Sequence, residues 1–187
     1  SLTVMKSLYF VTGNKNKAKE AEAILEIPIE VIDIPIDEVQ SMDLEYVVTK
    51  KAEAAFDSLK KPLIVDDVGF YIDAWNGFPG PLVKFLFSSL TNKEVLNVFK
   101  NEENRGGVLR NSIGYHDGKS IHVFIGERRV TLALEEKGSD GWGLDPIVIP
   151  EGETKTIAEL GFEHKNKNSH RSRSLNLLKE FLDKNPL

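Results

Sequence analysis

The chain has 187 residues, of which 41% are hydrophobic and 28% charged, and its formal net charge is −5 at pH 7. These values are typical of one globular α/β domain and exclude a disordered chain. The acidic balance disfavours nucleic-acid binding, and the lack of cysteine excludes disulfides, thiolate metal sites and cysteine nucleophiles. No apolar run approaches the ~20 residues of a membrane span, and the N-terminus lacks a signal-peptide core, so we expect a cytoplasmic protein. Residues 1–4, which precede Met5, are expected to be an addition to the natural start.

Apolar periodicity in the first third of the chain predicts alternating strands and helices. In order, it predicts a strand at 7–11, a helix ending near Pro28, a strand at 29–34, a helix at 44–59 and a strand at 63–65. The last of these strands is apolar on both faces, which is typical of a central parallel strand, and we expect it to stop at Asp66.

The rest of the chain predicts helices around a hairpin. In order, it predicts a turn cluster at 76–81, helices at 82–87 and 93–99, hairpin strands at 108–113 and 120–125, a glycine-spaced loop at 138–143 and a helix at 169–183. The pattern predicts a single α/β domain over residues 1–187, with a β-rich insert at about 101–138.

Two helix starts, at 12–19 and 166–173, carry positive charge where a helix prefers negative charge. Lys and Arg in a first helical turn are unfavourable by ~0.3–1 kcal/mol each, because unpaired N–H groups already make that end positive. Backbone donors, dipole and cations would then converge on an anion, which indicates a polyphosphate ligand. At the first start, Thr12 and Asn14 offer hydrogen bonds and Lys17 projects from the first turn, without the spacing of a Walker A motif. An ordinary Asn cap with surface lysines is the alternative.

Asp66 and Asp67 follow the central strand, where open α/β sheets place ligands. One or two carboxylates, substrate phosphates and water usually hold Mg²⁺. Glu38 ends the loop after the preceding strand and could reach the same edge. These residues predict a magnesium site, and a solvated turn after the strand is the alternative.

A glycine-flanked loop presents Trp142 and Asp145, which could stack on a base and accept from its ring N–H. Ser169, His170 and Arg171 offer donors for another edge of the base. A core tryptophan and a Ser helix cap are the alternatives. A Ser169–His170 relay is disfavoured because adjacent helical residues point in different directions, and the other histidines have no metal-ligand spacing.

Together these segments resemble the family of inosine/xanthosine triphosphate pyrophosphatases. The matching segments occur in the family's order over nearly the whole chain, at 10–17, 65–70, 73–81, 143–147, 156–160 and 168–171. The resemblance implies an elongated, two-lobed α/β fold around a long mixed sheet, with a nucleotide cleft between the lobes, in a homodimer. It implies Mg²⁺-dependent hydrolysis of ITP, dITP or XTP to the monophosphate and pyrophosphate, which cleanses the nucleotide pool, with no nucleic-acid or membrane partner.

The resemblance also implies roles for individual residues. Asp67 and Lys17 would be catalytic, and Glu38, Asp66 and Asp67 would bind the metal. The substrate would contact Thr12, Asn14, Lys17, Lys50, Trp142, Asp145, Lys165, Ser169, His170 and Arg171. The departures from the family are Val68 in place of Ser or Thr, Trp142 in place of Phe, Leu144 in place of an aromatic residue, and the missing second glycine of Gly126–Val130.

Two other functions remain open from the sequence. One is a pyrophosphatase for another base, such as a modified pyrimidine triphosphate. The other is a nucleotide sensor without catalysis, for which Val68 and Leu144 leave room. Binding of RNA or DNA through the basic helix starts is disfavoured by the net charge.

Overall fold

The computed structural model describes residues 6–187, which form two compact units. The first unit joins the chain up to Asp67 with Asn111–Gly126 and Arg171–Leu187, and the second joins Val68–Arg110 with Glu127–His170. The expectation for residues 1–4 lies outside the described residues. Within residues 6–187, no helix has both the length and the apolar character needed to cross a membrane.

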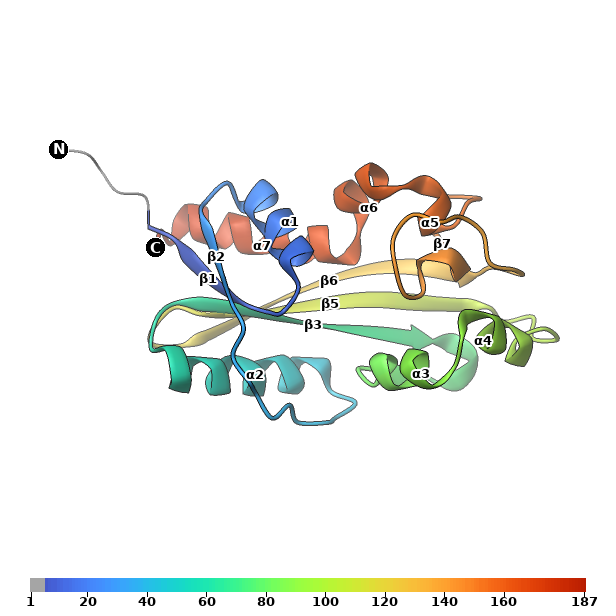
Figure 1. Cartoon of the computed structure of the whole chain (residues 1–187), viewed down its shortest axis with the longest axis horizontal. Coiled ribbons are helices and arrows are strands. Elements are labelled where there is room, and N and C mark those ends of the chain that lie inside the picture. Colours follow the sequence, from blue (N-terminus) through green and yellow to red (C-terminus); the bar gives the residue numbers. More distant parts are fainter. Residues whose placement is uncertain (1–5) are drawn as a thin grey trace. The chain divides into compact units, whose positions relative to one another are not determined.

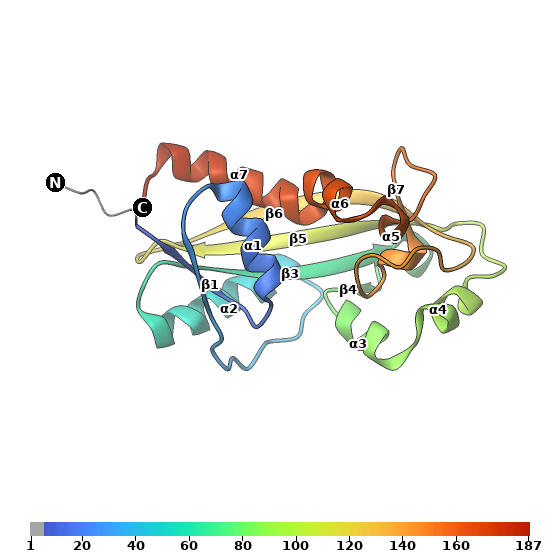
Figure 2. The same cartoon turned by 45° about the horizontal axis from the view of Figure 1, so that its top comes forward.

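The first unit is a sheet with helices on both faces. Its elements are β1 (Leu8–Val11), α1 (Lys15–Leu25), β2 (Ile29–Ile32), α2 (Leu44–Leu59) and parts of β3 (Leu63–Ile72), β5 (Gly106–His116), β6 (Ile121–Leu132) and α7 (His170–Lys184). The strand order in this unit is β2-β1-β3-β5-β6, and β1 is parallel to both neighbours. Figures 1 and 2 show α2 on one face and α1 and α7 on the other.

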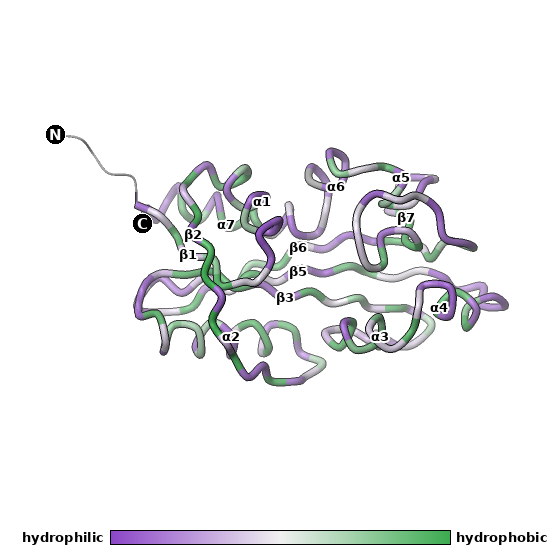
Figure 3. The backbone as a smooth tube through the Cα atoms, viewed as in Figure 1, coloured by the Kyte–Doolittle hydropathy of each residue, from purple (hydrophilic) through white to green (hydrophobic). Residues whose placement is uncertain are grey.

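Each face of this sheet has its own hydrophobic core. Leu8 and Phe10 of β1 pack toward α1 and α7, where they meet Leu175 and Leu178. Because side chains alternate along a strand, Val11 belongs to the opposite core, under α2. In Figure 3 the tube of α1, α2 and α7 alternates between green and purple, as expected for helices that bury one face.

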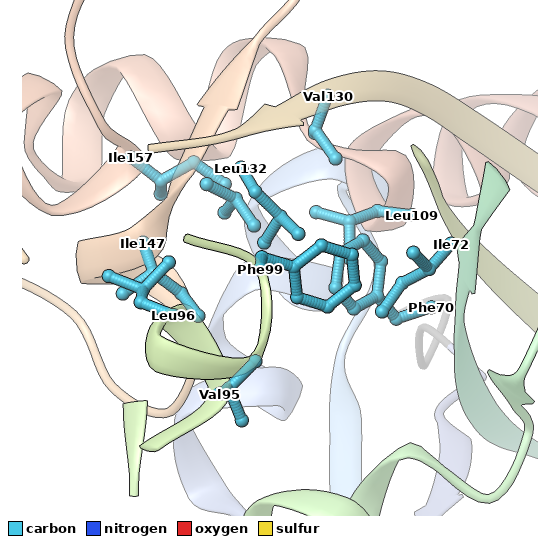
Figure 4. Close-up of a cluster of buried hydrophobic side chains, with 11 residues drawn as sticks. Phe70, Ile72, Val95, Leu96, Phe99, Leu109, Val130, Leu132, Ile147 and Ile157 are labelled. Carbon is cyan, nitrogen blue, oxygen red and sulfur yellow. The ribbon is translucent and has the colours of Figure 1, made fainter. Parts of the chain in front are cut away.

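The second unit contains the remaining elements and the other parts of β3, β5 and β6. These elements are β4 (Pro79–Gly80), α3 (Val83–Ser89), α4 (Asn92–Val98), β7 (Val148–Pro150), α5 (Ile157–Leu160) and α6 (Phe162–Asn168), with single 3-10 turns at Asp73–Trp75 and Asp145–Ile147. β4 is antiparallel to β3, and β7 is antiparallel to β6. Figure 4 shows Phe70 and Ile72 of β3 meeting Phe99 and Leu109 in the core of this unit.

The structure confirms the expected α/β class with a mixed sheet, which has seven strands within residues 6–187. It corrects two details of the sequence analysis. The central strand does not stop at Asp66 but continues to Ile72, because apolar residues resume after the two acids and pair with β4. Lys167 lies in the last turn of α6, where cations are favourable, and not at the start of the final helix. The strands expected as a β-rich insert are β5, which lies beside β3 in the sheet, and β6, which lies beside β5.

Candidate functional site

The turn from β1 into α1 is shaped by side chains that act as acceptors. The Oγ1 of Thr12 accepts from the backbone N–H of Asn14 at 3.0 Å. The Oδ1 of Asn14 accepts from the backbone N–H groups of Asn16 and Lys17, at 2.9 and 3.3 Å, which makes Asn14 the N-cap of α1. The first turn holds no acidic residue, so its positive end is left for another anion.

Lys17 extends from this turn to Asp66, which lies inside β3 and is 3% exposed. The Nζ of Lys17 lies 3.1 Å from one carboxylate oxygen of Asp66, and the Nε of Arg171 lies 3.3 Å from the other. Burial alone would raise the pKa of Asp66. The positive charges of Lys17, Arg171 and Lys51 outweigh burial and lower the pKa from its ordinary value of 3.8 to about 2. Asp66 is therefore ionised at neutral pH and binds cations from both ends of the chain.

This pairing predicts a pH dependence of stability. The pKa of Asp66 is lower in the folded chain, at about 2, than its ordinary value of 3.8, so its contribution is complete above pH 3.8 and is lost as the pH falls toward 2. The contribution is about 2 kcal/mol. Urea unfolding between pH 6 and pH 2.5 should show this loss in the wild type and not in Asp66→Asn. Equal pH dependence of the two proteins would contradict the pairing, and Asp57→Asn is the control because Asp57 is exposed.

Lys51 of α2 connects two more acids, Glu38 and Asp67, to Asp66 and its partners. Its Nζ donates to the backbone carbonyl of Asp66 at 3.0 Å and lies 3.0 Å from an oxygen of Glu38. Burial lowers the pKa of Lys51, but attraction to Asp67, Asp66 and Glu38 outweighs burial and raises it. Lys51 is thus a half-buried, charged lysine among three carboxylates.

Glu20 completes the group from α1. One of its oxygens lies 3.5 Å from Nη1 of Arg171, and both side chains are nearly buried. The residues of this group form what we call the carboxylate cluster: Lys17, Glu20, Glu38, Lys51, Asp66, Asp67 and Arg171. All of them lie in the first unit.

The carboxylate cluster fits a hard cation that is held together with a substrate. Within residues 6–187, no group of three or more His, Cys, Asp or Glu side chains could hold a metal ion by itself. Mg²⁺ needs fewer protein ligands, because phosphate oxygens and waters complete its shell. Glu38, Asp66 and Asp67 provide oxygen ligands of the kind that Mg²⁺ prefers, and Asp66 is ionised.

The structure brings Lys51 into the carboxylate cluster and leaves Lys50 outside it. Lys50 is exposed, and its Nζ lies 3.3 Å from Glu53 on the same helix. A helical pattern could have distinguished the two lysines: Val47, Val48, Ala52 and Ala55 are the buried face of α2, and Lys51 lies on that face. Glu20 was missed in the same way, one helical turn beyond Lys17 on α1.

The second unit contains a separate group around Asp145, which is 5% exposed. Its Oδ2 accepts from the backbone N–H of Trp142 at 3.0 Å and from Nζ of Lys165 at 2.6 Å. The same Nζ lies 3.8 Å from the centroid of the Trp142 ring. Trp142 also contacts Phe162 and remains 44% exposed. We call Trp142, Asp145, Phe162 and Lys165 the aromatic cluster.

Gly141 is required for this geometry. Its φ of +88° favours glycine, and a Cβ there would lie 2.2 Å from Oδ2 of Asp145. The loop is also fixed on its other side, where Asn92 donates to the carbonyl of Gly143 at 2.8 Å. The glycine spacing of this loop therefore permits the backbone to approach the carboxylate of Asp145 closely. Trp142 is exposed, which excludes the alternative of a core tryptophan.

Ser169 and His170 lie at the junction of α6 and α7, where both are buried. The N–H of Ser169 donates to the carbonyl of Lys165 at 2.9 Å and so ends α6. Arg171 follows directly in sequence, but its ion pairs are with Asp66 and Glu20 in the first unit. Arg171 therefore belongs to the carboxylate cluster of the first unit, and Ser169 and His170 belong to the second unit.

A mixed α/β fold with a lysine-bearing helix start beside buried carboxylates defines a candidate nucleotide phosphohydrolase. The model of the Ham1 family matches residues 8–181, and the chain belongs to this family. It is 41% identical over 181 residues to the dITP/XTP pyrophosphatase of Methanopyrus kandleri, covering 94% of this chain and 96% of that protein. It is 40% identical over 183 residues to the dITP/XTP pyrophosphatase of Methanosarcina acetivorans, covering 96% and 97% of the two chains.

The fold resembles solved structures of the same family. The Ham1 protein of Staphylococcus aureus matches with a TM-score of 0.82 and 27% identity, over 96% of this chain and all of that one. A HAM1 protein of Coxiella burnetii matches with a TM-score of 0.83 and 25% identity over the same shares. The likeness therefore extends over nearly the whole chain.

Proposed function

We propose that this protein hydrolyses non-standard purine nucleoside triphosphates, namely ITP, dITP and XTP, to the monophosphate and pyrophosphate. The carboxylate cluster carries the proposal, because it places the ionised Asp66 beside several cations in a chain similar to named dITP/XTP pyrophosphatases. Such a set can neutralise a triphosphate and orient a water, which is most of what this hydrolysis requires.

The cations of the cluster bind the phosphates. Lys17 and Lys51 leave their carboxylate partners and take phosphate oxygens, while Thr12 and Asn14 fix the turn that holds Lys17. Glu38 and Asp66 would hold Mg²⁺, and the ion would supply charge neutralisation for the leaving pyrophosphate. Asp67 accepts the proton of the water that attacks the α-phosphorus.

The aromatic cluster binds the base. The exposed ring of Trp142 stacks on the purine, and Lys165, Ser169 and His170 provide donors near it. Hypoxanthine and xanthine carry an oxygen at C6 that accepts hydrogen bonds from such donors. Adenine carries an amino group there, which would leave buried donors unpaired at a cost of ~1–3 kcal/mol each. Arg171, which the resemblance assigned to the base, is paired with Asp66 and Glu20. The homodimer and the cytoplasmic location remain predictions from the sequence.

A panel of nucleotides tests the proposal. Pyrophosphate release should be faster from dITP, ITP and XTP than from ATP, with kcat/KM at least about 10²-fold higher, because one or two buried donors would be unpaired with adenine. Omitting Mg²⁺ should abolish release. Binding of dITP without any turnover would mean that the protein is a nucleotide sensor and not an enzyme. Faster pyrophosphate release from a modified pyrimidine triphosphate than from dITP would mean that the substrate carries a different base.

A further inference from the structure

Arg128 is a buried cation on β6 that has no place in the function described so far. It lies in the stretch Gly126–Val130, where the sequence lacks the second glycine expected by resemblance. Residues of β6 alternate between buried and exposed at this point, and Arg128 is 8% exposed. Its neighbour Arg129 points the other way and pairs with Asp73 at the surface, with 52% of its side chain exposed.

The guanidinium of Arg128 lies at the end of α6. Its Nη1 donates to the backbone carbonyl of Asn168 at 3.0 Å. Asn168 is the last residue of α6, and the last carbonyls of a helix have no partner within the helix. A cation at this end also interacts favourably with the helix dipole. Arg128 therefore caps α6 through a side chain that comes from a neighbouring strand.

A second contact holds the outer side of the same helix. Nη2 of Arg128 lies 3.5 Å from Nε2 of His164, and that nitrogen lies 3.6 Å from an oxygen of Glu153. The three side chains join β6, the segment after β7 and α6 within the second unit. In Figures 1 and 2 the helix α6 lies alongside β6, as these contacts require.

The helix that Arg128 caps carries groups assigned to the base. Lys165 of α6 bonds to Asp145 and lies over Trp142, and its carbonyl accepts from the N–H of Ser169. Ser169 follows immediately after the carbonyl that Arg128 holds. A shift at the end of α6 would therefore move both the ammonium of Lys165 and the Ser169 junction.

We propose that Arg128 is a positioning residue for the base-binding groups, which it holds in place by capping the C-terminus of α6. This inference rests on the proposed function and adds a determinant of substrate affinity. Arg128 acts through Lys165 and Ser169 and does not itself touch the substrate. Because the base is held throughout the reaction, losing this support should weaken binding of the ground state and of the transition state equally.

The experiment compares two adjacent arginines. Steady-state kinetics of pyrophosphate release from dITP are measured for the wild type, Arg128→Ala, Arg128→Lys and the control Arg129→Ala. Arg128→Ala should raise KM about tenfold with kcat within about twofold, as expected when uniform binding is lost. Arg128→Lys should recover part of this loss, because an ammonium can still donate to one carbonyl. Arg129→Ala should leave KM unchanged.

Each outcome decides the matter. A wild type that releases no pyrophosphate from dITP overturns both the proposed function and this inference. An active wild type with an unchanged KM in Arg128→Ala, or with a fall confined to kcat, overturns this inference alone. A KM rise that is equal in Arg128→Ala and Arg129→Ala also overturns it, because the effect would then come from charge. If Arg128→Ala does not fold, Arg128→Lys decides the question. A KM rise of at least about twofold in Arg128→Lys would support the inference, since a guanidinium with several donors is replaced by a single ammonium, and an unchanged KM would overturn it.

Discussion

Replacing Asp67 with asparagine should lower kcat for dITP by about 10²–10⁴-fold, the range that general-base catalysis contributes. The amide keeps the size of the side chain and its place on β3, but it cannot accept a proton from the attacking water. Asp67 lies close enough to Lys51 to raise the pKa of that lysine, which places its charge within the carboxylate cluster. Binding of dITP should persist, because the cations that hold the phosphates remain.

Two measurements on Asp67→Asn separate catalysis from binding. Pyrophosphate release gives the turnover, and calorimetric titration with dITP in the absence of metal gives the affinity. Asp57→Asn is the matched control, because Asp57 is exposed and lies 3.8 Å from Lys60 on the surface of α2. Turnover of Asp67→Asn within about tenfold of the wild type would remove Asp67 from the role of base, since that is below the range for such a residue.

Replacing Lys51 with glutamine should lower kcat/KM for dITP by about 10²-fold or more, whereas Lys50→Gln should change it less than about twofold. Lys51 is half-buried and lies 3.0 Å from both the Glu38 carboxylate and the Asp66 carbonyl, while Lys50 is exposed. Removing Lys51 leaves the carboxylates around it without that compensating charge. The phosphates would also lose a cation.

The comparison of Lys50 and Lys51 needs a stability control, since Lys51→Gln removes a half-buried charge. Thermal unfolding is measured for each variant, and Lys51→Arg keeps the charge while changing its shape. A larger kinetic effect for Lys50→Gln than for Lys51→Gln would return the role to Lys50, as the resemblance first implied. An unchanged kcat/KM in both folded variants would mean that neither lysine contacts the phosphates.

The sequence predicted the helical and strand elements best where one face was clearly apolar. The helix at Leu44–Leu59 was predicted with the bounds that the structure shows, although its apolar spacing is less regular than in other segments; in the structure Asp43 caps its start. The continuation of β3 was missed, because Asp66 and Asp67 interrupt the apolar run and imitate a turn. In the structure these acids lie between the stretch of β3 that pairs with β1 and the stretch that pairs with β4.

The sequence predicted several residues of the candidate site, but it did not predict which side chains they contact. The sequence indicated that Lys17, Asp67 and Arg171 serve one ligand. The structure places all three in the carboxylate cluster, where Lys17 and Arg171 pair with the neighbouring Asp66. The sequence could not show that Arg171 pairs with Glu20 and Asp66, because those contacts depend on how α1 and α7 pack on one face of the sheet (Figure 1). Arg128 carried no signal beyond a missing glycine, since its role depends on the end of a helix far away in sequence.

The pairing of early and late residues in one hydrophobic core has a consequence for how the chain folds as it is made. Leu8 and Phe10 leave the ribosome well before Leu175 and Leu178 have been translated, yet the four share a core. At the usual rates of translation the wait is on the order of ten seconds or more. Through that interval the nascent sheet exposes apolar side chains, and Asp66 lacks the guanidinium of Arg171. Chaperone protection during synthesis therefore matters most for this face of the first unit.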